Sequence, residues 1–244
     1  MNSILITGAS SGIGKATALA FLQAGWRVGL VARRAAPLLA MAEEYEGAIA
    51  LPADVTDEIA MEAAFSKFAQ QAGRLDVLFN NAGMFGPMAP IDEVPLAQFE
   101  EVMNVNLRGM FIAARLAFGQ MRRQTPQGGR IINNGSLSAH NPRPGSVCYT
   151  TTKHAITGLT RSLSLDGRAF DIACGQIDIG NARSELVEEL QAKARAENPG
   201  AEPAPTMDVE DAARSVLHMA QLPASANVQF MTVLASKMPY IGRG

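Results

Sequence analysis

Tyr149 and Lys153 are the residues of this sequence whose types and spacing point most directly to proton transfer. Residues four positions apart lie on one face of a helix, so the phenol and the ammonium would be neighbours there. A phenol ordinarily has a pKa of about 10, and a nearby positive charge favours its ionised form. The spacing therefore predicts a tyrosine that exchanges a proton with a substrate oxygen while the lysine tunes its pKa.

A glycine-rich segment near the start of the chain has the composition of a nucleotide phosphate site. Thr7-Gly8-Ala9-Ser10-Ser11-Gly12-Ile13-Gly14 lies between an apolar strand pattern and an amphipathic helix pattern. The three glycines would let the backbone turn tightly and approach a pyrophosphate, whose charge would meet N–H groups at a helix N-terminus. A glycine-rich turn without a ligand is the plainer alternative, and the flanking strand and helix patterns argue against it.

The end of the second strand pattern bears on the identity of the nucleotide. An NAD enzyme usually places an acidic residue there, about 20 residues beyond the glycines, to bind the ribose 2′-hydroxyl. This chain instead reads Val31-Ala32-Arg33-Arg34 and has no carboxylate at that point. Two guanidinium groups suit a 2′-phosphate, so the sequence favours NADP(H) over NAD(H). Solvated arginines at the start of a helix are the alternative interpretation.

The elements that must position these residues alternate between short apolar strand patterns and longer helical patterns, which is typical of βαβ units around a parallel sheet. Strands are expected at Ser3–Thr7, Arg27–Ala32, Ala48–Pro52, Val77–Asn80, Arg130–Asn134, Asp171–Ile177 and Val228–Val233. Helices are expected at Gly12–Ala24, Pro37–Tyr45, Asp57–Ala72, Pro95–Arg123, Val147–Gly167, Ser184–Ala196 and Val209–Leu222. The sequence thus predicts a single-domain α/β fold, a doubly wound parallel sheet of about seven strands flanked by helices.

Two further expectations follow from this alternation. The carboxyl ends of parallel strands meet at one edge of the sheet, so Gly8, Asn80 and Gly135 should gather around one crevice. Side-chain caps at the N-termini of three helices are expected from Asp57, Ser146 and Asp208.

Five motifs, in their order along the chain, together resemble those of the classical short-chain dehydrogenase/reductase family. They are the glycine-rich segment, Asn80-Asn81-Ala82-Gly83, Asn106 within Asn104-Val105-Asn106-Leu107-Arg108-Gly109, Ser136, and Tyr149-Thr150-Thr151-Thr152-Lys153. The resemblance extends from Ser3 to at least Gly175 and implies a Rossmann-type fold over residues 1–244, usually assembled as a homotetramer or a dimer. It also implies hydride transfer between a nicotinamide cofactor and a carbonyl or secondary-alcohol substrate.

The same resemblance assigns roles to individual residues. Asn106, Ser136, Tyr149 and Lys153 look like the catalytic tetrad of the family. Ser136 would polarise the carbonyl, Tyr149 would donate the proton, Lys153 would also hold the nicotinamide ribose, and Asn106 would anchor a water in a proton relay. Considered singly, Ser136 is equally well explained as a turn cap and Asn106 as a solvated helix residue. Residues expected to bind the cofactor are Thr7, Gly8, Ser10, Ser11, Gly12, Ile13, Gly14, Arg33, Arg34, Asp54, Val55, Asn80, Asn81, Ala82, Gly83, Tyr149, Lys153, Ile177 and Asn181.

The segment after the sixth strand departs from the family pattern of Pro-Gly followed by a threonine. It reads Cys174-Gly175-Gln176-Ile177-Asp178-Ile179-Gly180-Asn181. The backbone of Ile177 is expected to bind the nicotinamide carboxamide, with Asn181 in place of the threonine. Gln176 and Asp178 either face the substrate or serve as loop hydrogen-bond partners. The segment around 182–207 matches in position the family's substrate-covering lid.

Composition excludes several other classes of function. The chain has 244 residues and 48% hydrophobic content, enough to bury a full core. Its 21 basic and 23 acidic residues nearly cancel and form no long blocks, which argues against a nucleic-acid or membrane partner. Cys148 and Cys174 are too few for a disulfide framework, and the three histidines have no metal spacing, so we expect no metal site. With no signal-peptide pattern or long apolar run, a cytoplasmic location is the expectation.

The leading hypothesis from sequence is an NADP(H)-dependent oxidoreductase acting on a small carbonyl or secondary-alcohol substrate. Within this class, a 3-oxoacyl-thioester reductase and an NAD(H)-dependent polyol or steroid-type alcohol dehydrogenase are alternatives. A catalytically idle NADPH-binding regulator is the alternative from another class, and the intact Ser136, Tyr149 and Lys153 argue against it.

Overall fold

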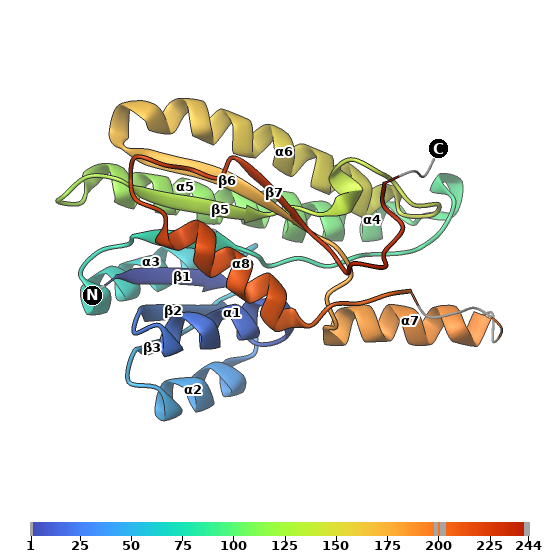
Figure 1. Ribbon diagram of the computed structural model, residues 1–244, viewed down its shortest axis with the longest axis horizontal. Helices are drawn as coiled ribbons and strands as arrows, with labels where there is room; N and C mark the ends of the chain where they lie inside the picture. The colour runs from blue at the N-terminus through green and yellow to red at the C-terminus, as the bar shows by residue number, and fades with distance from the viewer. Residues whose placement is uncertain (1, 198–199, 201–203, 242–244) are drawn as a thin grey trace.

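The computed structural model describes residues 2–197, 200 and 204–241 of the protein. Seven parallel strands form one sheet in the order β3-β2-β1-β4-β5-β6-β7 (Figure 1). They are β1 (Ser3–Thr7), β2 (Arg27–Ala32), β3 (Ala48–Pro52), β4 (Val77–Asn80), β5 (Gly129–Asn134), β6 (Ile172–Ile179) and β7 (Phe230–Val233). The predicted doubly wound parallel sheet is therefore confirmed, and the order of strand addition reverses between β1 and β4.

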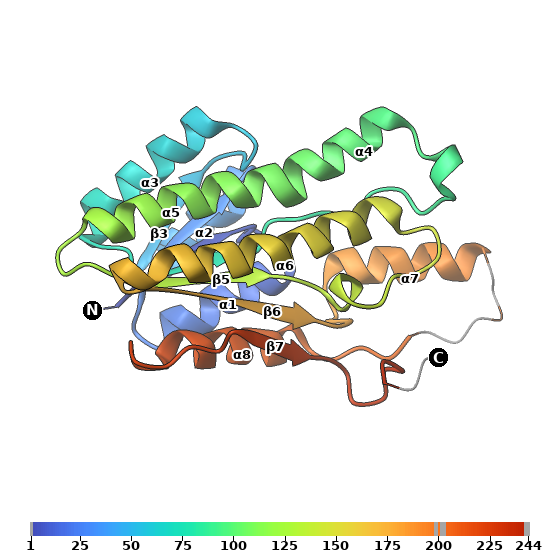
Figure 2. The ribbon, with the colours of Figure 1, turned by 90° about the horizontal axis from the view of Figure 1, so that it is seen from above.

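Helices cover both faces of this sheet, as the two perpendicular views show (Figures 1 and 2). The helices are α1 (Gly12–Gln23), α2 (Ala35–Glu44), α3 (Glu58–Ala72), α4 (Leu96–Met103), α5 (Met110–Arg123), α6 (Val147–Gly167), α7 (Glu185–Glu197) and α8 (Val209–Gln221). One layer contains α1, α2 and α8, and the other contains α3, α5 and α6. Each layer buries a separate hydrophobic cluster against the sheet.

The pattern of β1 explains how the two clusters are separated. All five of its residues are buried, as expected for a central strand of a parallel sheet. Ile4 and Ile6 belong to the cluster under α1 and α8, whereas Leu5 belongs to the cluster under α3 and α5. Successive side chains of a strand point to opposite faces, so three consecutive apolar residues fill both cores. Packing on both faces fixes the position of β1 in the sheet. The strand ends at Thr7, at the edge of the sheet where the glycine-rich loop begins.

The helix predicted over Pro95–Arg123 is interrupted by a π-helical turn, which the sequence did not predict. α4 ends at Met103, the π turn covers Asn104–Gly109, and α5 starts at Met110. The side chain of Asn106 leaves the helix and bonds both backbone groups of Met84, with Nδ2 2.7 Å from the carbonyl oxygen and Oδ1 2.8 Å from the amide nitrogen. The helix thus widens at the residue whose side chain bonds a neighbouring segment. Such π turns are frequent at functional sites.

Only one of the three predicted side-chain caps is present. Asp57 Oδ1 accepts a hydrogen bond from the Ala60 amide at 3.0 Å, as predicted. Ser146 and Asp208 precede their helices, but neither side chain caps one. The Ser146 hydroxyl instead donates to the Arg143 carbonyl at 2.7 Å, and Asp208 lies 3.4 Å from Arg183 in an exposed ion pair. Ser146 has exchanged the capping bond for another local partner, whereas the partner of Asp208 comes from a distant segment.

The strand β6 extends to Ile179, beyond the predicted end at Ile177. Asp178 and Ile179 are paired with Thr232 and Val233 of β7, which continues the ladder toward the edge of the sheet. Asp178 is therefore part of a buried strand and not of a loop. In the described part of the chain, no helix combines the length and apolar character needed to cross a membrane.

Candidate active site

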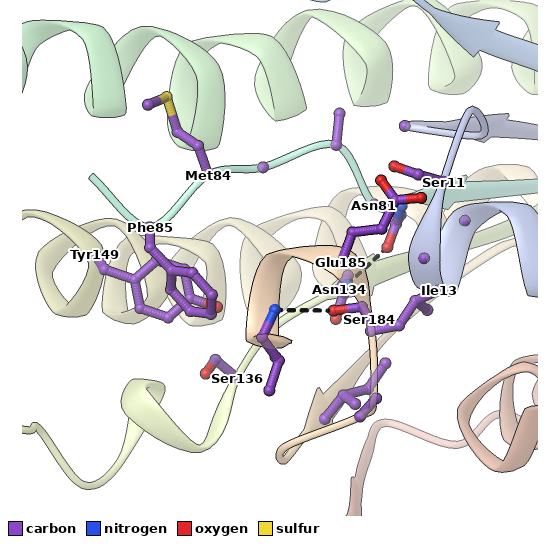
Figure 3. Close-up of a pocket in the computed structure, with 18 of the residues that line it drawn as sticks. Ser11, Ile13, Asn81, Met84, Phe85, Asn134, Ser136, Tyr149, Ser184 and Glu185 are labelled. Carbon is purple, nitrogen blue, oxygen red and sulfur yellow. Dashed lines mark hydrogen bonds between the residues drawn. The ribbon is translucent and has the colours of Figure 1, made fainter. Parts of the chain in front are cut away.

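A cleft of about 860 Å³ opens at the C-terminal edge of the sheet, over the point where strand order reverses. Ligands of open α/β sheets bind at such reversals. Figure 3 shows the rings of Tyr149 and Phe85 on one wall of the cleft and Ile13 with Ser184 on another. Most of the residues predicted to bind cofactor or act in catalysis line it, namely Gly8, Ser10, Ser11, Gly12, Ile13, Gly14, Arg33, Arg34, Asp54, Val55, Asn81, Ala82, Gly83, Ser136, Tyr149, Lys153 and Asn181.

The glycine-rich loop forms the floor of one half of the cleft. Gly8 and Gly12 have φ values of +70° and +51°, a backbone conformation that residues other than glycine rarely adopt. A Cβ atom at Gly14 would lie 2.1 Å from the Gly8 carbonyl oxygen, so the turn can close only without side chains. The first turn of α1 begins here and contains no acidic residue. Its N–H groups, which have no partners within the helix, can therefore receive an anionic ligand.

Positive charge lies beside this loop at the end of β2. Arg33 and Arg34 are exposed and line the cleft, and Arg34 Nη2 donates to the Ser10 hydroxyl at 3.3 Å. Asp54 lies at the same end, where its Oδ1 accepts bonds from the Thr56 amide and hydroxyl at 2.9 and 2.8 Å. The carboxylate is thus held by its own turn, and the two guanidinium groups stay available to the cleft.

Tyr149 and Lys153 lie on α6 at the other half of the cleft. The Lys153 ammonium is 5.4 Å from the centroid of the Tyr149 ring and donates to the Asn134 carbonyl at 2.8 Å. Lys153 is only 3% exposed, and this burial lowers its pKa to about 8, although the charge of Asp178 acts in the opposite direction. The helix therefore brings the phenol and a buried cation together, as their spacing predicts.

Opposing influences act on the phenol of Tyr149. Burial raises its pKa above the ordinary value, and the charge of Asp178 adds to this effect. A hydrogen bond with the Ser136 side chain and the positive charge of Arg143 lower it. Phe85 packs on the phenol with ring centroids 4.7 Å apart and an interplanar angle of 53°. The hydroxyl is thus directed toward Ser136 on the same wall of the cleft.

Ser136 combines the two roles that sequence analysis had treated as alternatives. It begins a short 3₁₀ helix over Leu137–Ala139, and its hydroxyl accepts a bond from the Ser138 amide at 3.1 Å. The same residue lines the cleft, where its side chain acts to lower the pKa of Tyr149. A local turn therefore fixes the hydroxyl beside the phenol.

Four of the predicted site residues lie outside the cleft in the structure. Thr7 is buried beneath it, where its hydroxyl accepts bonds from the Asn81 and Ala82 amides at 2.9 and 3.0 Å. Asn80, expected at the crevice, donates to the Met110 carbonyl at 2.7 Å, and Ile177 is packed into the core. Asn106 bonds Met84 and, at 3.2 Å, the Thr152 hydroxyl. These residues brace the walls of the cleft from behind.

Several residues that line the cleft were not named as site residues from the sequence, and four of them bear on the site. Ile179 lies where β6 ends, and Arg143 precedes α6 and bonds Asn181 Oδ1 at 3.1 Å. Ser184 and Glu185 lie at the start of α7, and the Ser184 Cβ is only 3.1 Å from where a Cβ of Gly12 would be. A hydroxyl residue shortly after Gly180 was the available signal for Ser184, since the family pattern has a threonine in this region. Asn181, which was expected to take that place, bonds Arg143 and the Pro205 carbonyl.

Comparison with known proteins identifies the family of this chain. A family model described as short chain dehydrogenase matches residues 2–195. The chain belongs to this family. It is 35% identical over 191 residues to an L-fucose dehydrogenase of Oryctolagus cuniculus, a match that covers 78% of this chain and 66% of that protein. A levodione reductase of Leifsonia aquatica is 32% identical, with 80% of this chain and 75% of that protein covered.

Solved structures of the short-chain dehydrogenase family have the same fold. A 3-ketoacyl-(acyl-carrier-protein) reductase from Brucella melitensis, complexed with NADH, superimposes with a TM-score of 0.86 at 25% identity. The superposition covers 96% of this chain and 97% of that one. This short-chain dehydrogenase is accordingly an oxidoreductase of the kind that acts on CH–OH and C=O groups.

Proposed function

We propose that the protein transfers a hydride between NADP(H) and a small carbonyl or secondary-alcohol substrate. One observation carries the proposal: Ser136, Tyr149 and Lys153 meet at one wall of a cleft whose other half contains a phosphate-binding loop. Groups suited to proton transfer and groups suited to anion binding therefore line the same cleft.

The residues of the cleft fit a nicotinamide dinucleotide. The closed turn at Gly8 and Gly14 leaves room for a pyrophosphate at the start of α1. Arg33 and Arg34 are placed to bind a 2′-phosphate through charge-assisted hydrogen bonds, which supports NADP(H) over NAD(H). When bound, the cofactor supplies the hydride. The same cleft would receive the adenine beside Asp54 and Val55, and the carboxamide near Ile179 and Ser184.

The catalytic chemistry follows from the donors on the opposite wall. The carbonyl oxygen of a substrate gains negative charge as its carbon is reduced, and it must be stabilised and then protonated. The side chains of Ser136 and Tyr149 line the same wall of the cleft, so one oxygen can contact both hydroxyls. Tyr149 then donates its proton, and the positive charges of Arg143 and of the nearby Lys153 favour the phenolate that remains. In the oxidative direction the same phenolate accepts the alcohol proton.

The remaining members of the predicted tetrad act around this centre in the proposal. Lys153 holds its ammonium against the Asn134 carbonyl, where it can also bind a ribose hydroxyl. Asn106 fixes the Met84 backbone and contacts Thr152, the residue before Lys153. The segment 182–207, of which 198–199 and 201–203 lie outside the described residues, acts as a lid in this proposal, because Ser184 near its start lies against the glycine-rich loop.

Two further properties belong to the same proposal. Phe111 and Leu165 are 53% and 60% exposed on the outer sides of α5 and α6, which supports a homo-oligomer that covers them. Cys148 and Cys174 are both free and buried, which fits a chain that works in the reducing cytoplasm. A single domain over residues 1–244 is consistent with one sheet that contains all seven strands.

The experiment is NADPH consumption with 3-oxoacyl thioesters and levodione, and NADP⁺ reduction with L-fucose. The parent protein should turn over at least one of them, and Tyr149→Phe should lower kcat by about 10³-fold because the proton donor is lost. Tyr240→Phe, outside the cleft, is the matched control and should retain the parent rate. NADPH binding without turnover of any carbonyl or alcohol would instead favour a regulator that only binds the nucleotide.

A further inference from the structure

Asp178 is a buried carboxylate directly behind the catalytic wall. It is 1% exposed at the end of β6 and accepts three hydrogen bonds. Its Oδ1 receives the Ser136 backbone amide at 2.9 Å and the Gln176 side-chain amide at 2.7 Å, and its Oδ2 lies 2.9 Å from His140 Nε2. A buried charge requires such partners, because desolvation without them is costly. All three partners come from segments that form or support the active site.

The backbone of the catalytic wall is shaped around this carboxylate. A Cβ atom at Gly135 would lie 2.0 Å from Asp178 Oδ1 and 2.6 Å from the Gln176 amide nitrogen. The Gly135 amide also donates to the Ile177 carbonyl at 2.8 Å, which continues the ladder between β5 and β6 by one residue. Only glycine fits this close to the Asp178 carboxylate. The position of Ser136, the next residue, is consequently determined by Asp178.

Gln176 connects Asp178 to the helix that carries the proton donor. Its Nε2 donates to the Thr157 hydroxyl at 3.1 Å, and its Oε1 accepts a bond from the Thr160 hydroxyl at 3.2 Å. Both threonines belong to α6, which also carries Tyr149 and Lys153. Gln176 therefore bonds β6 to α6 at two positions of the helix. A rigid connection of this kind holds its members in one geometry.

The charge of Asp178 is also felt by both titrating groups of the site. After the dominant effect of burial, it acts to raise the pKa of Tyr149 and that of Lys153. His140, whose side chain is 42% exposed at the rim, and Arg143 are the other charged or titratable groups on this side of the cleft. His140 is in direct contact with the carboxylate, so it supplies a compensating dipole or charge.

We propose that Asp178 is a positioning residue, which holds Ser136 through its backbone and sets the charge around the Tyr149–Lys153 pair. The inference rests on the proposed carbonyl-reducing function. This role differs from a purely structural one in two ways. The effect of Asp178 on kcat must depend on Ser136, and its charge must shift the pKa values of Tyr149 and Lys153. Both consequences can be measured separately.

Two substitutions separate hydrogen bonding from charge. Asp178→Ala removes both and should lower kcat by about tenfold or more, with the Kd for NADPH within about twofold of the parent. Asp178→Asn keeps an oxygen that accepts from Ser136 and Gln176, and its amide can donate to His140. We expect its kcat within about fivefold of the parent and its pH–rate limbs at lower pH, since loss of a negative charge lowers both pKa values of the pair.

A double-mutant cycle with Ser136→Ala tests whether Asp178 acts through the serine. In that background Asp178→Ala should lower kcat by less than about twofold further, because the positioned hydroxyl is already absent. An equal loss in both backgrounds, or an Asp178→Ala enzyme with the parent kcat, would overturn the inference. Should Asp178→Ala fail to fold, Asp178→Asn decides, and pH limbs that coincide with those of the parent would contradict it. A parent enzyme inactive on every substrate would contradict the proposed function instead.

Discussion

The two halves of the cleft are built in opposite ways. The half at the glycine-rich loop uses backbone N–H groups and exposed guanidinium groups, and these groups come from one stretch of the chain, residues 8–34. The half at Tyr149 uses buried polar side chains from β5, α6 and β6, which are joined by direct hydrogen bonds. A binding surface for phosphate can remain solvated, whereas a proton donor needs groups whose pKa values are shifted by burial.

Burying charged and polar groups lowers the stability of the folded protein, and only the half of the cleft at Tyr149 contains such groups in this comparison. Lys153 is held as a buried group with a pKa lowered to about 8 from the ordinary 10.5. Below pH 8 the folded protein must therefore keep a charge where burial opposes it. Arg33 and Arg34, beside the glycine-rich loop, do not have this desolvation cost because their side chains are exposed. Substitutions in the two halves should accordingly have different signatures.

The largest effect is expected from Lys153→Met, measured by urea unfolding from pH 7 to 10.5. Between its folded and unfolded pKa values a lysine binds more protons in the unfolded chain, so its contribution to the free energy of unfolding should rise with pH across about 8 to 10.5, by up to about 3 kcal/mol. The raised pKa of Cys174 acts in the opposite direction over part of this range, so the measured quantity is the difference between the parent and Lys153→Met, in which Cys174 cancels. This difference should change with pH in favour of the parent. Lys67→Met, at an exposed lysine, is the matched control and should show a constant difference. A constant difference for Lys153→Met as well would remove the distinction between the halves.

An intermediate effect is expected from Arg33→Asp in the phosphate-binding half. The Kd for NADPH should increase by about 10- to 100-fold because a charge-assisted phosphate contact is replaced by repulsion, while that for NADH changes by less than about twofold. Fluorescence titration of both cofactors measures the two values. Arg123→Asp, at the exposed end of α5, controls for the change of net charge. Equal weakening of both cofactors would show that Arg33 does not contact the 2′-phosphate.

The smallest effect is expected from Gly158→Ala on the outer face of α6. A Cβ there meets no atom within 4 Å, so alanine should stabilise the protein by about 0.5–1 kcal/mol without changing kcat. Thermal unfolding and steady-state rates measure both quantities. The comparison is Gly14→Ala, whose Cβ would lie 2.1 Å from the Gly8 carbonyl and should destabilise the protein and abolish NADPH binding. A stabilising Gly14→Ala would mean that the loop does not need its closed turn.

The sequence predicted the sheet well because the relevant signals are local. The bounds of β1, β2, β3 and β4 agree with their expected ranges, since runs of apolar residues between polar turns identify strands that are buried on both faces. The glycine-rich loop and the Tyr149–Lys153 pair were found for the same reason. Each is defined by spacing within a few residues.

What the sequence did not predict depends on contacts between distant segments. Asp208 has the residue type of a cap, but its side chain pairs with Arg183. Asp178 stood as either a substrate-facing group or a loop partner, and the structure places it in a strand beneath Ser136. Asn80 has the right position in its motif but points to Met110. None of these outcomes could be read from spacing, because each needs the relative placement of two elements.

The π turn at Asn104–Gly109 has a consequence for how this helix tolerates change in length. An α-helix rotates by about 100° per residue, and a π turn contains one residue more than a regular turn. Deleting one residue here would restore regular winding and leave α4 and α5 in nearly the same rotation about their common axis, because the π turn absorbs its extra residue within itself. The side chains inside the turn would shift instead, and Asn106 would lose its place opposite Met84. The extra residue therefore redirects one side chain without changing how the flanking helices pack.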